Sequence, residues 1–185
     1  MSEPLPPAAY IVLGMLSIGA RTGYDIKRNV ATSTRYFSTI SPVQIYPLLK
    51  ELEEAGLVRG RAEPRGRRPR RAFELTRAGR GRLRAWLEED EPPMLDMRDA
   101  GLLKLFFADA GGSGAALRLV QAIRARSERI LRELHERSDP AARGVGARGA
   151  AAPLMTLRFG IAMHEAWVAE CDRLERELAA ERRAV

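Results

Sequence analysis

Arginine is concentrated in one stretch of this 185-residue chain. Eleven arginines lie between Arg59 and Arg84, against two acidic residues, Glu63 and Glu74. Like charges at this density repel one another, so an exposed stretch of this kind favours a polyanionic partner. The phosphate backbone of double-stranded DNA is such a partner. A solubilising surface loop is the alternative, but ordinary surfaces intersperse both signs of charge. We therefore predict contact with DNA.

The sequence predicts that these arginines lie on and beside a β-hairpin. Two strand-like runs, residues 57–63 and 70–76, flank a turn at residues 64–69 that contains proline and glycine. A helix followed by a basic hairpin is the winged-helix arrangement, in which the helix enters the major groove and the wing follows the backbone.

The predicted helix directly precedes the hairpin. Ser41 followed by Pro42 favours an N-cap and a first helical position, and Gly56 favours the C-terminal cap. Pro47 removes one intrahelical hydrogen bond, so we expect a bend or an irregular turn near the helix start. Tyr46 lies at the border of an apolar face at helical spacing. That face carries Ile45, Leu48, Leu49 and Leu52.

Further helices are predicted on both sides of this pair of elements. Residues 8–17 form an apolar run, and Thr22 with Asp25 resembles a capping box at the start of another helix. Thr76 favours an N-cap for a helix at residues 77–89. The acidic, proline-containing segment 88–93 favours a helix end and marks the predicted domain boundary. Residues 1–91 are then a winged helix-turn-helix domain.

Residues 92–185 are predicted to form an all-helical domain, which makes the fold class mainly α with a small β wing. Helices are expected at 97–108, 115–137 and 153–182, separated by a glycine-rich turn at 111–114 and a loop at 139–152. The last helix carries a narrow apolar stripe close to a coiled-coil seam, so we expect the two long helices to pair within or between chains.

Composition narrows the protein class. The net charge of +7 belongs to the first half, because residues 1–90 hold 16 Lys/Arg and 10 Asp/Glu, against 15 and 14 in the remainder. Cys171 is the single cysteine, which excludes an internal disulfide. No apolar run reaches the length of a membrane span, and the N-terminus lacks signal-peptide features. A cytoplasmic protein without membrane association is expected.

Three segments of the first ninety residues resemble the PadR family of bacterial transcriptional regulators. They are YIVLGMLSIGARTGYDIKRNV (10–30), SPVQIYPLLKELEEAGLV (41–58) and RRPRRAFELTRAGRGRL (67–83). The middle segment is the most specific, and Pro47 falls where the family has a proline. Arg71 stands for the usual lysine and Ala72 for an aromatic residue. The second half is similar to the helical C-terminal domain of one branch of the family.

The resemblance implies a homodimer that presents two winged helices to a pseudo-palindromic operator, usually as a repressor, with release by a small-molecule effector where one exists. Half-sites would lie about 34–36 Å apart. The implied DNA contacts are Ser41, Gln44, Tyr46 and Lys50 in the recognition helix, Tyr24 and Lys27 before it, and Arg67, Arg68 and Arg70 in the wing. Gln44 suits bidentate pairing with adenine. For Tyr24 and Tyr46, core packing is the alternative.

A second group of residues could line an effector pocket or a dimer core. Its members are large or titratable side chains on apolar helix faces: Trp86, Phe106, Phe159, Met163, His164 and Trp167. We favour core and dimer packing for them. Two histidines and one cysteine are too few and too poorly spaced for a structural metal site, and no cofactor is expected. The sequence contains neither a phosphate-binding glycine loop nor a nucleophile elbow, so an enzyme is not expected.

Three functions remain to be weighed. The leading hypothesis is a sequence-specific regulator. The first alternative is an architectural DNA-binding protein with little sequence preference, which the arginine excess allows. The second is an interaction module whose long helices bind another chain. The polar face with Gln44 and Tyr46 favours the regulator, because these side chains suit recognition of base edges.

Overall fold

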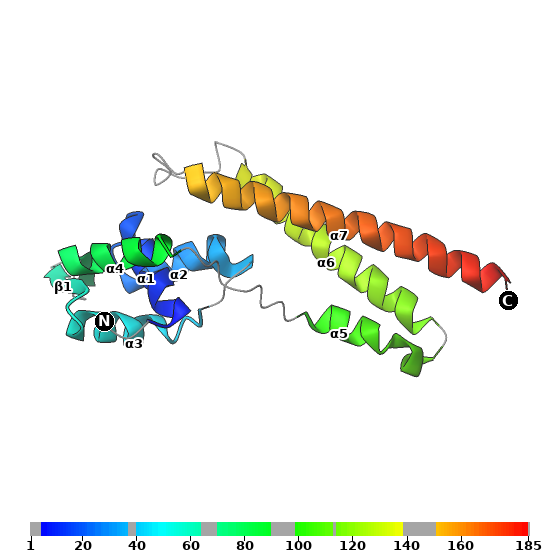
Figure 1. Cartoon of the computed structure of the whole chain (residues 1–185), viewed down its shortest axis with the longest axis horizontal. Coiled ribbons are helices and arrows are strands. Elements are labelled where there is room, and N and C mark those ends of the chain that lie inside the picture. Colours follow the sequence, from blue (N-terminus) through cyan, green and yellow to red (C-terminus); the bar gives the residue numbers. More distant parts are fainter. Residues whose placement is uncertain are drawn as a thin grey trace. The chain divides into compact units, whose positions relative to one another are not determined.

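The computed structural model describes residues 5–36, 40–63, 70–89, 99–112, 114–138 and 151–184. The chain divides into two compact units, Met1–Pro93 and Met94–Val185 (Figure 1). The predicted boundary at residues 91 and 92 lies outside the described residues.

The first unit has the predicted order of helices followed by a hairpin and a helix. One buried apolar core joins the elements, and Leu13, Ile26 and Leu49 are among its fully buried side chains. The elements are α1 (Pro7–Ser17), α2 (Gly23–Thr32), a 3-10 turn η1 (Thr34–Tyr36), α3 (Ile45–Glu54), β1 (Val58–Glu63), β2 (Arg70–Leu75) and α4 (Arg77–Leu87). This is the predicted winged helix-turn-helix.

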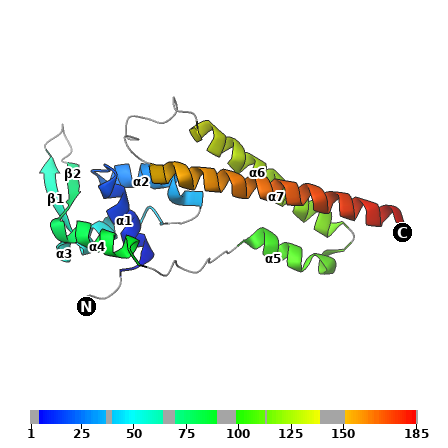
Figure 2. The same cartoon turned by 45° about the horizontal axis from the view of Figure 1, so that its top comes forward.

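The wing consists of β1 and β2, which pair antiparallel from Val58 opposite Leu75 to Glu63 opposite Arg70 (Figure 2). Buried Phe73 and Leu75 fix its base to the core. The Phe73 amide also donates to the Arg21 carbonyl at 2.7 Å, which ties β2 to the segment before α2. The predicted strands are confirmed to within one residue at their ends, and the predicted turn at 64–69 lies outside the described residues.

The start of α3 corrects the predicted N-cap. Ser41 is not the cap, because Ser41–Gln44 forms a separate turn and the helix begins at Ile45. The Gln44 amide donates to the Ser41 carbonyl at 2.9 Å, and Gln44 Oε1 accepts from the Ser41 amide at 3.0 Å. Pro47 therefore lies in the first helical turn, where its missing N–H has no intrahelical acceptor to lose. The predicted loss of an intrahelical hydrogen bond at Pro47 is therefore wrong, and the irregular backbone is the Ser41–Gln44 turn before the helix.

Two predicted caps are confirmed. Thr22 and Asp25 form a complete capping box at α2, and the Thr76 hydroxyl accepts from the Gly79 amide at 3.0 Å at α4. Each cap provides an acceptor for a helix-start N–H that has none within its own helix. These caps define where α2 and α4 begin, before and after α3 in the chain.

The second unit contains only helices among its described residues. They are α5 (Ala100–Phe106), a 3-10 turn η2 (Ala108–Gly111), α6 (Ala115–Ser138) and α7 (Ala151–Ala184). Asp99 caps α5 by accepting from the amides of Gly101 and Leu102, and it pairs with Arg126 at 2.7 Å.

The long helices α6 and α7 lie side by side and antiparallel (Figures 1 and 2). The predicted stripe on α7 faces α6: Val120, Ile123 and Cys171 form a buried cluster, and Arg124 pairs with Asp172 at 2.5 Å. α7 begins at Ala151, two residues before the predicted start. Across the described ranges, no helix combines the length and apolar character that a bilayer span requires.

Candidate nucleic-acid interface

The residues predicted to contact DNA from α3 lie on its outer side. The side chains of Tyr46 and Val43 are 61% and 80% exposed, and Ser41, Gln44 and Lys50 are also exposed. The opposite side of the same segment is buried, with Ile45 and Leu49 each 1% exposed. Burial of one face therefore holds the polar face towards solvent.

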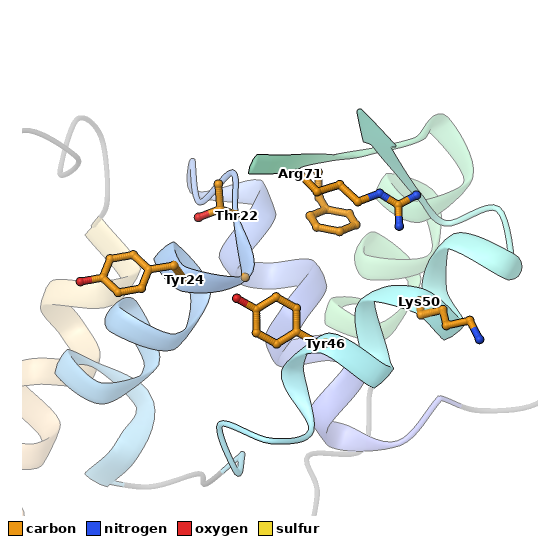
Figure 3. Close-up of a pocket in the computed structure, with 7 residues that line it drawn as sticks. Thr22, Tyr24, Tyr46, Lys50 and Arg71 are labelled. Atoms are coloured by element: carbon orange, nitrogen blue, oxygen red, sulfur yellow. The ribbon is translucent and has the colours of Figure 1, made fainter. Parts of the chain in front are cut away.

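Tyr46 and Lys50 line a hollow of about 350 Å³ between α2, α3 and β2 (Figure 3). We call it the α2–α3 hollow. Figure 3 shows the Tyr46 ring directed towards the start of α2, whereas the Lys50 side chain extends away from the ring. Its full lining is Thr22, Gly23, Tyr24, Tyr46, Lys50, Arg71 and Phe73. The structure thus brings together Tyr24, Tyr46 and Lys50, which are far apart in the sequence.

Gly23 determines how closely Tyr46 approaches α2. A Cβ atom added at Gly23 would lie 2.6 Å from Tyr46 Cε1 and 3.2 Å from its hydroxyl oxygen, so any larger residue would displace the ring. Tyr24, next in sequence, is 57% exposed. Lys27 is also exposed on α2. Both tyrosines therefore leave more than half of their surface exposed.

Two wing arginines, Arg61 and Arg71, are exposed and each bears an ion pair. Arg61 pairs with Glu74 at 3.3 Å, and Arg71 pairs with Glu53 at 2.8 Å. Exposed pairs of this kind contribute roughly 0–1 kcal/mol, so a phosphate can compete for these cations. The predicted contacts Arg67 and Arg68 lie outside the described residues, and Arg70 is described only as the first residue of β2.

The prediction missed two residues at this surface. No role is predicted for Val43, although it is the most exposed large apolar residue among the described residues of the first unit. Arg71 was noted only as a substitute for lysine, yet it lines the α2–α3 hollow. The alternation of buried and exposed residues expected along a strand does not predict which side chains of β2 face the hollow, because the neighbouring Ala72 and Phe73 are both buried.

The residues proposed for an effector pocket or a dimer core fall into separate environments. Trp86 stacks on Tyr10 with ring centroids 4.5 Å apart, inside the first unit. In the second unit, Phe106 and Phe159 are 81% and 75% exposed, and Met163 is also exposed. Trp167 packs against the cluster between α6 and α7, and the Arg126 guanidinium lies 5.5 Å from its ring centre.

His164 is buried on α7, with 8% of its surface exposed. Among the described residues, its Nδ1 atom has no hydrogen-bond partner, and the same holds for the hydroxyl of fully buried Ser127 on α6. Burial lowers the pKa of His164, and the nearby Arg126 charge lowers it further. Burial and the Arg126 charge both favour the neutral imidazole in the folded chain.

We predict that His164 makes the second unit less stable in acid. A histidine whose pKa is lowered by folding contributes stability above its unfolded pKa of about 6.5, and that stability is lost as the pH falls through the folded value. The loss cannot exceed about 1.4 kcal/mol per pH unit for one proton. Urea unfolding at pH 7.5 and 5.5 should show that His164→Leu reduces the acid sensitivity. Equal sensitivity in both proteins would contradict the prediction.

Both halves of the chain match models of known protein families. Residues 12–85 match the transcriptional regulator PadR-like family, and residues 97–179 match the virulence activator alpha C-terminal family. The negative transcriptional regulator PadR of Bacillus subtilis is 31% identical over 99 residues, which cover 53% of this chain and 54% of that protein. The matched part thus spans about half the length of this curated relative.

Solved structures share the fold over nearly the whole chain. Bacillus subtilis PadR in complex with operator DNA has a TM-score of 0.81 at 22% identity, covering 92% of this chain and 98% of that one. The same protein in complex with p-coumaric acid has a TM-score of 0.76 at 22% identity and the same coverage. The Vibrio cholerae virulence activator AphA has a TM-score of 0.69 at 26% identity, covering 94% and 99%.

Proposed function

We propose that this chain, whose residues 12–85 match the PadR-like family of transcriptional regulators rather than a family of enzymes, binds a specific operator as a homodimer and acts as a repressor. The observation that carries this proposal is the exposed face of α3 beside an arginine-bearing wing. Gln44, Tyr46 and Lys50 supply donors for base edges and phosphates, and Gln44 and Tyr46 lie at the N-terminal end of the recognition helix, where base contacts are usual. A regulator of this kind acts in the cytoplasm.

The dimer is supported by apolar side chains that the second unit leaves exposed. They lie on α5, just after it, and on the first half of α7: Leu103, Phe106, Phe107, Met155 and Phe159, each at least 62% exposed. Each of these two groups consists of large apolar side chains close together in the sequence and exposed, as is typical of protein–protein contact surfaces. A second copy of the chain would cover these side chains and place two wings on one operator, with half-sites about 34–36 Å apart. Residues 92–185 would be the dimerisation domain.

We also propose that a small-molecule effector binds the second unit. Bacillus subtilis PadR has been solved with p-coumaric acid. In the present chain, the buried polar atoms of Ser127 and His164 lie on the paired helices α6 and α7. An effector that bound one arrangement of these helices better than another would shift the distance between the two wings.

We predict that Gln44→Ala removes sequence preference without abolishing DNA binding. Loss of a bidentate base contact costs about 1–3 kcal/mol of discrimination. Fluorescence anisotropy on the DNA upstream of the chain's own gene, with scrambled DNA as competitor, measures that preference. Gln44→Glu keeps the acceptor for the Ser41 amide but loses the amide donor. If both variants lose the preference, the effect belongs to the base contact rather than to the turn.

Two controls separate the regulator from the architectural alternative. Gln121→Ala makes the same substitution at an exposed position of α6 and should change nothing. Joint replacement of Arg67, Arg68 and Arg70 by Gln should weaken binding to all DNA alike, because phosphate contacts carry no sequence information. If wild type binds upstream and scrambled DNA equally well, the architectural function is correct.

A further inference from the structure

The α2–α3 hollow contains a cation whose orientation is set by the recognition helix. Both Glu53 carboxylate oxygens lie 2.8 Å from Nη2 of Arg71, and Glu53 Oε1 also accepts from the Gly60 amide at 2.9 Å. The Arg71 guanidinium lies 5.4 Å from the centre of the Phe73 ring. Glu53 of α3 thereby links both wing strands and holds the guanidinium at the edge of the hollow.

Gly60 is required for this arrangement. A Cβ atom at Gly60 would lie 2.7 Å from Arg71 Nε and 2.8 Å from Glu53 Oε1. Any side chain there would push the ion pair away from β1. Glycine at position 60 therefore allows the β1 backbone, the Glu53 carboxylate and the Arg71 guanidinium to lie close together, although none of them belongs to the apolar core. Such a surface ion pair contributes little to stability, which suggests that its geometry serves binding.

The remaining donors around the hollow point to an anion. Glu53 contacts only Nη2 of Arg71, and within the described residues Nε and Nη1 have no acceptor. Lys50 carries a second positive charge, held only by an exposed pair with Glu54 at 3.6 Å. The Tyr46 hydroxyl is a further donor that no described residue engages. The Thr22 hydroxyl, by contrast, already donates to Asp25 at 2.8 Å.

We propose that the α2–α3 hollow seats one backbone phosphate of the bound DNA, with Arg71 as its main cationic contact and Glu53 as the residue that positions Arg71. This inference rests on the proposed DNA-binding function. At about 350 Å³, the hollow is far larger than the space that one water molecule needs, which leaves room for a phosphate oxygen pair and its hydration. Arginine suits this role because its planar donors bind phosphate oxygens bidentately. The phosphate fixes the position of α3 and the wing together on the duplex.

The test uses DNA in which single phosphates are replaced by neutral methylphosphonates, one position at a time. Wild type should lose affinity at one position in each half-site. Arg71→Gln should lose that sensitivity, and its binding should show a salt slope lower by about 0.9 per subunit. Arg61→Gln removes the same charge from the same wing, outside the hollow, and should retain the sensitive position. Arg71→Lys should keep most of the salt slope.

The Glu53→Gln variant tests whether Glu53 positions Arg71 or acts on DNA only through its negative charge. Removing a negative charge near DNA should tighten binding if only electrostatics matter, and the control Glu54→Gln should do so. If Glu53 positions Arg71, Glu53→Gln should instead weaken the response to the sensitive phosphate. If wild type prefers its upstream DNA but Arg71→Gln leaves the methylphosphonate profile unchanged, the phosphate seat is wrong and the regulator stands. If wild type shows no preference for that DNA, the proposed function fails and this inference fails with it.

Discussion

Replacing Phe159 by Glu is expected to convert the protein to a monomer and to weaken operator binding by about 10²- to 10⁴-fold, the range that linking two binding modules provides. Phe159 is 75% exposed on α7, so the substitution removes little packing within one chain. In a two-fold dimer the same patch occurs on both subunits, so each interface would bury two new carboxylates. Desolvation of unpaired charges is costly, and the equilibrium shifts to free subunits.

Sedimentation equilibrium and fluorescence anisotropy measure the two consequences separately. Gln121→Glu adds the same charge at an exposed polar position of α6 and should leave both the dimer and the operator affinity unchanged. Circular dichroism should show unchanged helix content in Phe159→Glu, because the ring is not part of the buried cluster between α6 and α7. A Phe159→Glu protein that remains dimeric would exclude this surface as the interface.

Local sequence patterns were sufficient to predict most helices and both strands of this fold. Apolar periodicity located α3 and the stripe on α7, and hydroxyl residues located the starts of α2 and α4. The error at Ser41 has a local cause too. The Gln44 side chain accepts from the Ser41 amide and stabilises a turn that competes with an earlier helix start.

The contacts that build the candidate site were not predictable in the same way. Glu53 meets Arg71 across 18 residues, and Gly23 meets the Tyr46 ring across the space between two helices. Such contacts depend on how helices and strands approach one another, which no local periodicity encodes. The resemblance supplied the residue types at α3 and the wing, whereas the hollow between them emerged only from the packed structure.

Gly79, the third residue of α4, shows how closely the wing base and α4 approach. A Cβ atom there would lie 2.0 Å from the carbonyl oxygen of Leu57. That oxygen also accepts from the Thr76 amide at 3.1 Å, beside the Thr76 cap that receives the Gly79 N–H. An alanine at this position must therefore displace backbone, and a flexible side chain cannot relieve the contact.

We expect Gly79→Ala to lower the free energy of unfolding of the first unit by about 2–3 kcal/mol, in the range of overpacked cores. Gly81→Ala, two residues later in the same helix, meets nothing within 4 Å and should raise it by about 0.5–1 kcal/mol, because alanine loses less backbone entropy than glycine. Urea unfolding followed by Trp86 fluorescence in a Trp167→Phe background measures both. Helix propensity alone would stabilise both variants, so opposite signs identify close packing of α4 on Leu57 as the cause.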